Sequence, residues 1–131
     1  MKVLIVDDDF TSRVFLQEVL KYYASSHVAV NGVEAVEAVR ISLQEGEPYN
    51  LICLDIMMPE MSGQEALIRI RQMENEFKIP PQNRSRIIMT SALGDKENVM
   101  SAVQQQCDHF LVKPIKKAAL LEILTKLGMI V

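Results

Sequence analysis

The chain has 131 residues, of which 49% are hydrophobic and 24% are charged, and this balance is typical of one folded domain rather than a disordered segment. Its net charge of −3 argues against direct binding of nucleic acid, which normally relies on an excess of clustered Lys and Arg. The apolar runs are too short to cross a membrane, and acidic residues follow the first run too closely for a secretory signal, so we expect a cytoplasmic protein.

Short apolar runs recur along the chain, separated by longer segments in which apolar residues have helical spacing. Four runs predict strands and a weaker one, the second in the chain, predicts a fifth: Val3–Val6, Val28–Val30, Leu51–Leu54, Ile87–Met89 and Phe110–Val112. Because most of these runs are continuously apolar rather than alternating, we expect strands that are covered on both faces, as in a parallel sheet.

Helices are predicted after each strand from apolar stripes of helical spacing. The stripes are Leu16, Val19, Leu20 and Tyr23; Val36, Val39 and Leu43; Ala66, Ile70, Met73 and Phe77; Val99, Ala102 and Val103; and Leu120, Ile123, Leu124 and Leu127. Ser62 and Glu65 have the spacing of a capping box, and Gly128 is a suitable residue to end the last helix. The stripe within Asp95–Gln106 has few large apolar residues. We therefore expect the helix in this segment to be the least buried.

The alternation of strands and helices predicts an α/β domain with a flavodoxin-like (βα)5 fold. This fold is a three-layer sandwich with a parallel five-stranded sheet in the order 2-1-3-4-5 and helices on both faces. Ligands bind such sheets at the carboxyl ends of the strands, near the switch point between strands 1 and 3. The carboxyl ends are therefore the place to look for chemistry.

Polar residues stand at the carboxyl ends of four predicted strands. They are Asp7, Asp8 and Asp9; Asp55; Thr90 and Ser91; and Lys113. In the predicted order these strands are neighbours, so their end groups should converge on one edge of the sheet. We favour Ser91 over Thr90 as the contributing hydroxyl, because adjacent side chains in a strand point to opposite faces. Asp9 is interpreted as a turn former or helix cap.

The chemistry that these groups favour is phosphoryl transfer. Clustered carboxylates repel one another unless a cation neutralises them, and hard oxygen ligands with open positions suit Mg²⁺, with Mn²⁺ as an alternative. Asp55 could be a carboxylate nucleophile, Lys113 a charge for a phosphate and Ser91 a hydrogen-bond donor. Phosphoryl transfer needs mainly such positioning and charge stabilisation. The two histidines and two cysteines lack metal-ligand spacing and are expected to be packing or surface residues.

The segments IVDDD, LDIMMPEMSG, MTSA and FLVKPI have an order and spacing that resembles the receiver domain of two-component response regulators of the chemotaxis type, across essentially the whole chain. The resemblance implies that Asp55 accepts a phosphoryl group from a sensor histidine kinase or a histidine phosphotransfer protein. It also implies that Asp8, Asp55 and the backbone carbonyl of Met57 bind Mg²⁺, while Asp7 acts through metal-bound water.

Three further implications concern the response to phosphorylation. Lys113 would contact a phosphate oxygen, and Ser91 would occupy the Ser/Thr switch position. Phe110 would occupy the aromatic position whose rotamer changes when the switch residue moves. A downstream effector protein would then bind the surface of the fourth helix, fifth strand and fifth helix. The Lys113–Pro114 bond is expected to be cis, against the general trans preference of ~0.5–1 kcal/mol at such bonds.

The sequence departs from the family pattern in several places. Gln106 and Cys107 replace a usual Gly-Ala pair, and the segment Lys78–Arg86 is longer than usual, on the edge of the sheet opposite the expected site. Met57 and Leu93 stand where rapidly dephosphorylating members often carry amide or acidic side chains. Since neither residue can orient a water by a strong hydrogen bond, we expect a long-lived phosphorylated state.

Two other functions fit part of this pattern. A Mg²⁺-dependent phosphatase with an aspartyl nucleophile would need a second acid two residues after Asp55, where this chain has Met57. An interaction module that is never phosphorylated would not need the full set of acids, hydroxyl and lysine. We therefore expect a switch rather than an enzyme, with residues 1–131 forming one receiver domain without an output domain, and we favour a stand-alone regulator because Met1 resembles a natural start.

Overall fold

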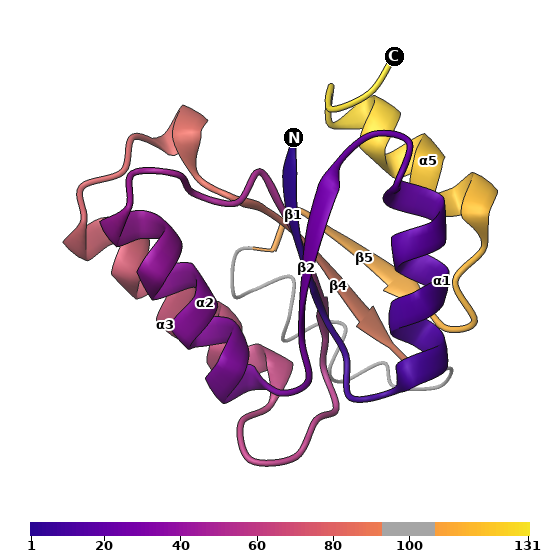
Figure 1. The fold of residues 1–131 in the computed structure, drawn as a ribbon, viewed down its shortest axis with the longest axis horizontal. Coiled ribbons are helices and arrows are strands. Elements are labelled where there is room, and N and C mark those ends of the chain that lie inside the picture. Colours follow the sequence, from indigo (N-terminus) through magenta and orange to yellow (C-terminus); the bar gives the residue numbers. More distant parts are fainter. Residues whose placement is uncertain (93–106) are drawn as a thin grey trace.

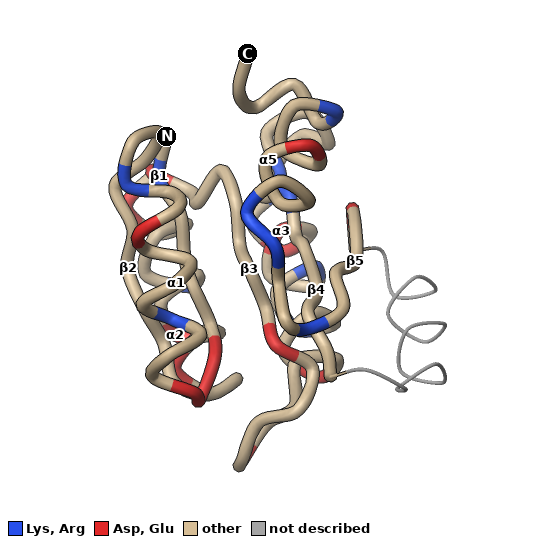
Figure 2. The backbone as a smooth tube through the Cα atoms, turned by 90° about the vertical axis from the view of Figure 1, so that its right-hand side faces the viewer, with Lys and Arg blue, Asp and Glu red and all other residues tan. Residues whose placement is uncertain are grey.

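A parallel five-stranded sheet lies between two layers of helices in the computed structural model, which describes residues 1–92 and 107–131 (Figure 1). Its strands are β1 (Lys2–Val6), β2 (Ser25–Ala29), β3 (Leu51–Asp55), β4 (Arg86–Ser91) and β5 (His109–Val112). They lie in the order β2-β1-β3-β4-β5, which runs from left to right in Figure 2, and every neighbouring pair is parallel. The predicted flavodoxin-like sheet is therefore confirmed.

The described helices cover both faces of this sheet. They are α1 (Phe10–Leu20), α2 (Gly32–Gln44), α3 (Gly63–Glu76) and α5 (Lys117–Lys126), with a short 3-10 turn at Pro81–Asn83. Helices α2 and α3 lie on one face, and α1 and α5 lie on the other (Figure 1). The helix predicted at Asp95–Gln106 lies outside the described residues. Within the described ranges, no helix is long and apolar enough to cross a membrane.

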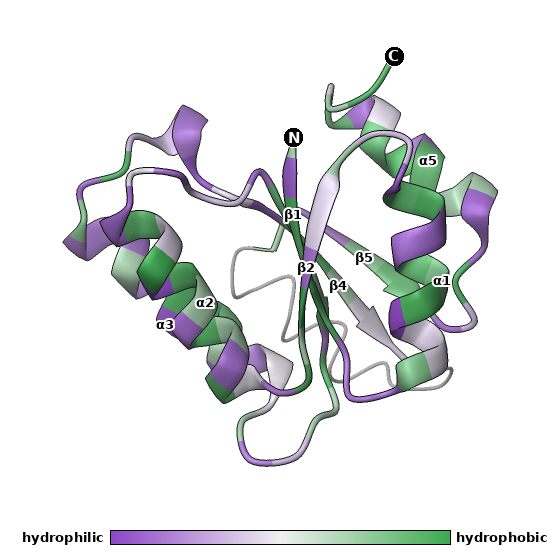
Figure 3. Cartoon of the chain, viewed as in Figure 1, coloured by the Kyte–Doolittle hydropathy of each residue, from purple (hydrophilic) through white to green (hydrophobic). Residues whose placement is uncertain are grey.

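The central strands are buried on both faces because their side chains alternate between two apolar clusters. In β1, Leu4 and Val6 pack with α2 and α3, whereas Val3 and Ile5 pack with α1 and α5. These residues are at most 1% exposed, which explains why the run is continuously apolar. The edge strand β2 is more exposed and is drawn in paler colours than the green central strands in Figure 3.

Most strand bounds differ from the sequence-based prediction by one or two residues, and three differences concern apolar residues that are exposed. The second strand is Ser25–Ala29 rather than Val28–Val30, and Val28 is 46% exposed because β2 lies at the sheet edge. Helix α1 ends before Tyr23, which is 41% exposed instead of packing on the sheet. Phe77 is the C-cap of α3 and is also exposed. Tyr23 and Phe77 lie just past the last residues of their helices, whereas β2 begins earlier than predicted because its first three residues, Ser25–His27, are polar.

The helix caps agree with the prediction. The side chain of Asp9 accepts a hydrogen bond from the Ser12 N–H at the start of α1, as expected for a cap. Ser62 does the same for Glu65 at the start of α3. Gly128 follows the end of α5 with φ of +72°. The two N-caps begin their helices shortly after the ends of β1 and β3, beside the edge where the site was predicted.

Candidate functional site

Three carboxylates meet at the carboxyl ends of β1 and β3. Asp7 and Asp8 directly follow β1, and Asp55 is the last residue of β3, where the foot of the strand is red in Figure 2. One carboxylate oxygen of each residue lies within 4.8 Å of the others. Asp7 and Asp55 are only 1% and 4% exposed, whereas Asp8 is exposed. The structure thus brings these three predicted residues together and leaves one side of the cluster open to solvent.

Lys113 completes the cluster from the end of β5. Its Nζ lies 2.8 Å from Asp7 Oδ2 and 3.4 Å from Asp55 Oδ2. Its backbone N–H donates to the Ser91 carbonyl at 2.7 Å, which joins the ends of β4 and β5. The Lys113–Pro114 bond is cis, as predicted. The ammonium group therefore reaches the proposed nucleophile directly.

The Asp7 carboxylate is held by donors from the protein on both oxygens. Its Oδ1 accepts the Asp9 N–H at 2.9 Å, and its Oδ2 accepts Lys113 Nζ. The Asp7 backbone carbonyl accepts a hydrogen bond from Arg13 Nη1 at 2.9 Å. The sequence analysis did not anticipate Arg13, because its side chain reaches back over the first turn of α1 and follows no recognised spacing. These contacts fix Asp7 within the cluster.

Burial and like charge shape the electrostatics of the cluster. Burial, and then the charge of Asp7, raise the pKa of Asp55 to about 6 against the opposing effect of Lys113. Burial alone would lower the pKa of Lys113, but the hydrogen bond to Asp7 and the charge of Asp55 outweigh it and raise that pKa. Lys113 therefore stays charged at neutral pH. Its single charge does not balance the three acids around it.

The donor set fits a hard divalent cation. The three carboxylates supply oxygen ligands at short mutual distances, and their mutual repulsion favours a cation among them. The exposed position of Asp8 leaves room for water or a phosphate oxygen on such an ion. Both Asp7 oxygens already accept hydrogen bonds from the protein, whereas Asp8 is exposed to solvent.

Helix α3 packs closely against the end of β3, and this contact positions Asp55. The Gly63 N–H donates to the Ile56 carbonyl at 2.9 Å. A Cβ added to Gly63 would lie only 2.0 Å from the Asp55 backbone oxygen, so no other residue fits here without a shift of the backbone. The sequence indicated a helix start at Ser62-Gly63 but not this contact, which depends on how the helix packs.

Ser91 and Phe110 lie on one side of the sheet. Ile87 and Met89 of β4 pack toward α2 and α3, so alternation places the fully buried Ser91 on the same side. The half-buried Phe110 of β5 also packs there. Phe110 and the Ser91 hydroxyl are thus on the same side of the sheet, as a coupled movement of the two side chains would require. Leu93 lies outside the described residues, as does the fourth helix of the predicted output surface.

A hollow of about 480 Å³ opens beside Lys113, between the start of α1 and the loop after β5. Phe15 and Ile115 contribute to its walls. Phe10, the first residue of α1, is 69% exposed. Met57, which follows Asp55 by two positions, is 63% exposed. The cluster is thus open to solvent at Asp8, and Lys113 borders the hollow.

The chain is similar to known proteins over nearly all of its length. The family model described as "Response regulator receiver domain" matches residues 3–125. The chemotaxis protein CheY of Bacillus subtilis is 35% identical over 127 residues, which cover 95% of each chain. The hybrid signal transduction histidine kinase L of Dictyostelium discoideum is also 35% identical, over 97% of this chain but only 7% of the kinase.

Solved structures with the same fold include two complexes. One contains CheX, CheY, BeF3 and Mg²⁺ from Borrelia burgdorferi; it has a TM-score of 0.81 and 27% identity, and covers 98% of this chain and 89% of that chain. The other contains the Saccharomyces cerevisiae histidine phosphotransfer protein Ypd1 and the receiver domain of its downstream response regulator Ssk1. It has a TM-score of 0.82 and 29% identity, and covers 98% of this chain and 88% of that chain.

Proposed function

This chain belongs to the response regulator receiver domain family, whose members are phosphoacceptor switches, and on that premise we propose that Asp55 is the residue that accepts the phosphoryl group. One observation carries the proposal: Asp55 ends β3 as a buried carboxylate, with two further carboxylates within 4.8 Å and Lys113 Nζ at 3.4 Å. A nucleophile, a cation site and a fixed positive charge thus share one edge of the sheet.

In the proposed reaction an Asp55 oxygen attacks the phosphorus of a phosphohistidine. The P–N bond breaks, and its electron pair returns to the imidazole nitrogen of the donor. Lys113 contacts an oxygen of the transferred group, since its Nζ already lies beside Asp55 Oδ2. The reaction depends mainly on positioning and charge stabilisation, so the fixed geometry of Asp7 and Lys113 is its main requirement.

Mg²⁺ is the proposed cofactor, and Mn²⁺ is the alternative. When bound, the ion supplies positive charge against the incoming phosphoryl group and the clustered acids. We assign its direct ligands to Asp8, Asp55 and the Met57 carbonyl, and a water-mediated contact to Asp7. The presence of Mg²⁺ in the complex of the related CheY supports Mg²⁺ as the cofactor.

The proposed phosphoryl donor is a sensor histidine kinase or a histidine phosphotransfer protein. The similarity to the Ssk1 receiver, which is solved in complex with Ypd1, supports a donor of this kind. The exposed Asp8 offers the donor access to the acid cluster, and the exposed Phe10 offers an apolar contact at the start of α1. Exchange with such donors is proposed to occur in the cytoplasm.

Phosphorylation is proposed to act on Ser91 and Phe110. The new phosphoryl oxygens would draw the Ser91 hydroxyl and Lys113 inward, and Phe110 would turn into the space left behind. A downstream effector would then recognise the surface that includes β5 and α5. To shift the equilibrium between the two states from a ratio of 1:99 to 99:1, the phosphoryl group must interact with one state about 5.5 kcal/mol more favourably than with the other.

The phosphorylated state is proposed to be long-lived because of Met57. Its exposed thioether lies close to the acceptor in the chain and cannot hold an attacking water by a strong hydrogen bond. The signal would then end through a partner protein more than through self-hydrolysis.

A phosphodonor titration tests the proposed acceptor. Wild type, Asp55→Asn and the control Asp9→Asn would each receive a small acyl phosphate with Mg²⁺, and intact mass would be followed with time. Asn also serves well as a helix cap, so Asp9→Asn should be modified like wild type. Equal modification of Asp55→Asn would refute the assignment of Asp55.

A further inference from the structure

A second polar hollow lies at the opposite edge of the sheet, where the strands begin. It has a volume of about 340 Å³, and its walls include Tyr49 and Asn50 before β3 and Asn83, Arg84 and Arg86 around the start of β4. This volume is in the range of small-ligand sites, roughly 300–1,000 Å³. The phosphorylation site at the other end of the strands does not use this hollow.

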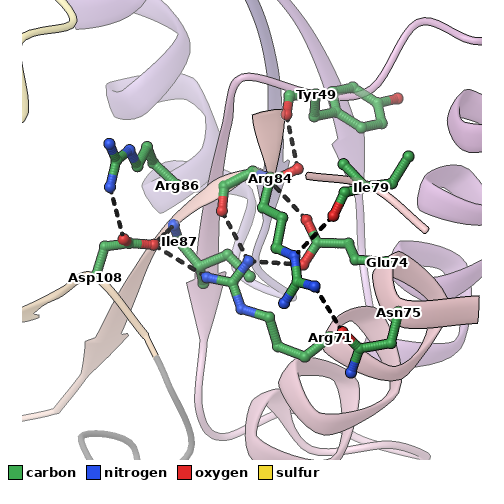
Figure 4. A network of polar contacts seen from close by, with 10 residues as sticks. Tyr49, Arg71, Glu74, Asn75, Ile79, Arg84, Arg86, Ile87 and Asp108 are labelled. Carbon is green, nitrogen blue, oxygen red and sulfur yellow. Dashed lines mark hydrogen bonds and ion pairs between the residues drawn. The ribbon is translucent and has the colours of Figure 1, made fainter. Parts of the chain in front are cut away.

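Arg84 is fixed in this hollow without a negative partner. Its Nε donates to the Ile79 carbonyl at 3.2 Å, and its Nη2 donates to Asn75 Oδ1 at 2.7 Å (Figure 4). Both acceptors are neutral, and none of the carboxylates in the described ranges forms an ion pair with Arg84. A guanidinium has five N–H donors, so several of them remain for a ligand. Partial burial of an unbalanced charge favours an anion beside it.

Arginines are concentrated in the polar network beside the hollow, although the whole chain carries −3. Asp108 is shared by two arginines: Arg71 Nη2 lies 3.0 Å from Oδ2, and Arg86 Nη1 lies 3.3 Å from Oδ1. Arg71 also pairs with Glu74 at 2.8 Å. This network thus holds three arginines, counting Arg84, and two acids, and of the three arginines Arg84 and Arg86 line the hollow.

A buried network holds the walls of the hollow in place (Figure 4). Glu74 is 1% exposed, and its Oε2 accepts the Ser85 N–H at 2.9 Å. Arg71 donates to the Ser85 carbonyl at 2.9 Å, and the Ser85 hydroxyl donates to the Tyr49 carbonyl at 2.6 Å. The segment that carries Arg84 is therefore fixed before a ligand arrives, which lowers the entropic cost of binding.

We propose that this hollow binds a small phosphate-bearing anion, with Arg84 and Arg86 as the recognising residues. Guanidinium groups match phosphate oxygens with paired, charge-assisted hydrogen bonds. The amide side chain of Asn83 adds neutral hydrogen-bonding capacity on the same wall. The proposal does not depend on phosphorylation of Asp55, because the two sites are at opposite ends of the strands.

Titration of ¹⁵N-labelled protein with inorganic phosphate tests the proposal. The titration is run at constant ionic strength and without Mg²⁺, and amide shifts of residues 82–86 are followed. Saturable shifts are expected in wild type. Arg84→Gln and Arg86→Gln should each weaken binding by about tenfold, the effect of ~1.4 kcal/mol. Arg69→Gln is the control, since Arg69 pairs with Glu76 and does not line the hollow.

Three results would overturn the proposal. The first is the absence of saturable shifts in wild type, and the second is equal binding by wild type and both arginine variants. The third is equally tight binding of acetate in a parallel titration, which would remove the preference for phosphate. Arg84→Lys is a second variant that controls for loss of the fold. It keeps the positive charge but lacks the planar guanidinium group with its paired donors, so it should bind phosphate more weakly than wild type. Amide shifts far from the hollow should stay unchanged in this variant.

Discussion

The substitution Gly63→Ala should impair phosphorylation by displacing Asp55 without touching any reacting group. The added Cβ would lie 2.0 Å from the Asp55 backbone oxygen and 2.8 Å from the Asp55 carbonyl carbon, whereas real Cβ atoms essentially never approach closer than 3.0 Å. The start of α3 and the end of β3 must therefore separate by about 1 Å. Misplacing a reacting group by ~1 Å can cost about 10²-fold in rate.

The expected results are a loss of stability of about 1–3 kcal/mol from overpacking and a phosphorylation rate about 100-fold below wild type. Urea denaturation gives the first value, and mass spectrometry after mixing with a small acyl phosphate and Mg²⁺ gives the second. The rate is measured at a temperature where the variant remains folded, as judged by circular dichroism.

Gly46→Ala is the matched control. Gly46 has φ of +72° and no atom within 4 Å of an added Cβ, so alanine there costs about 1 kcal/mol of backbone strain far from Asp55. It should lower stability and leave the rate close to that of wild type. A Gly63→Ala protein that is phosphorylated as fast as Gly46→Ala would refute the claim that this contact positions the acceptor.

Three further predictions concern single side chains. Because the pKa of Asp55 is raised to about 6, the folded state holds a proton that the unfolded chain releases, so the contribution of Asp55 to metal-free stability should fall as pH rises from 3.8 to about 6. Asp55→Asn should remove this fall and gain up to about 3 kcal/mol above that range in urea denaturation; an unchanged pH profile would contradict the raised pKa. Met57→Asn should speed phosphoryl loss, measured as phosphate release, by up to roughly 100-fold. This is the lower end of the roughly 10²–10⁴-fold that a positioned proton-transfer group contributes, because an Asn side chain orients the attacking water without taking its proton. No acceleration would count against the role of Met57. Lys78 has φ of +56° at the end of α3, so Lys78→Gly should stabilise the fold by about 0.5–1 kcal/mol in thermal unfolding, and a loss of stability would mean that the Lys78 side chain makes a stabilising contact.

Much of the fold could be predicted because the central strands are buried on both faces. The residues Val3–Val6 pack alternately into two apolar clusters, one on each face of the sheet, so all four of them are apolar. The edge strand Ser25–Ala29 has no such requirement on its exposed side, so its bounds were predicted poorly. The positions of Asp7, Asp55 and Lys113 followed from the fold, since parallel strands end at one edge of the sheet.

Other features could not be predicted because they join residues far apart in the chain. Arg71 meets Asp108 across 37 positions, and Ser85 meets Tyr49 across 36, with no periodicity to mark either pair. The tight contact of Gly63 with Asp55 depends on the angle at which α3 packs on the sheet. These contacts are set by tertiary packing, which local sequence patterns do not encode.

The most direct test is to locate the phosphoryl group after wild type has reacted with a small acyl phosphate and Mg²⁺. Peptide mapping by tandem mass spectrometry should place one phosphoryl group on Asp55, and removal of the metal with a chelator should prevent its addition. A phosphoryl group on any other residue, or the same yield without the metal, would contradict the proposed site.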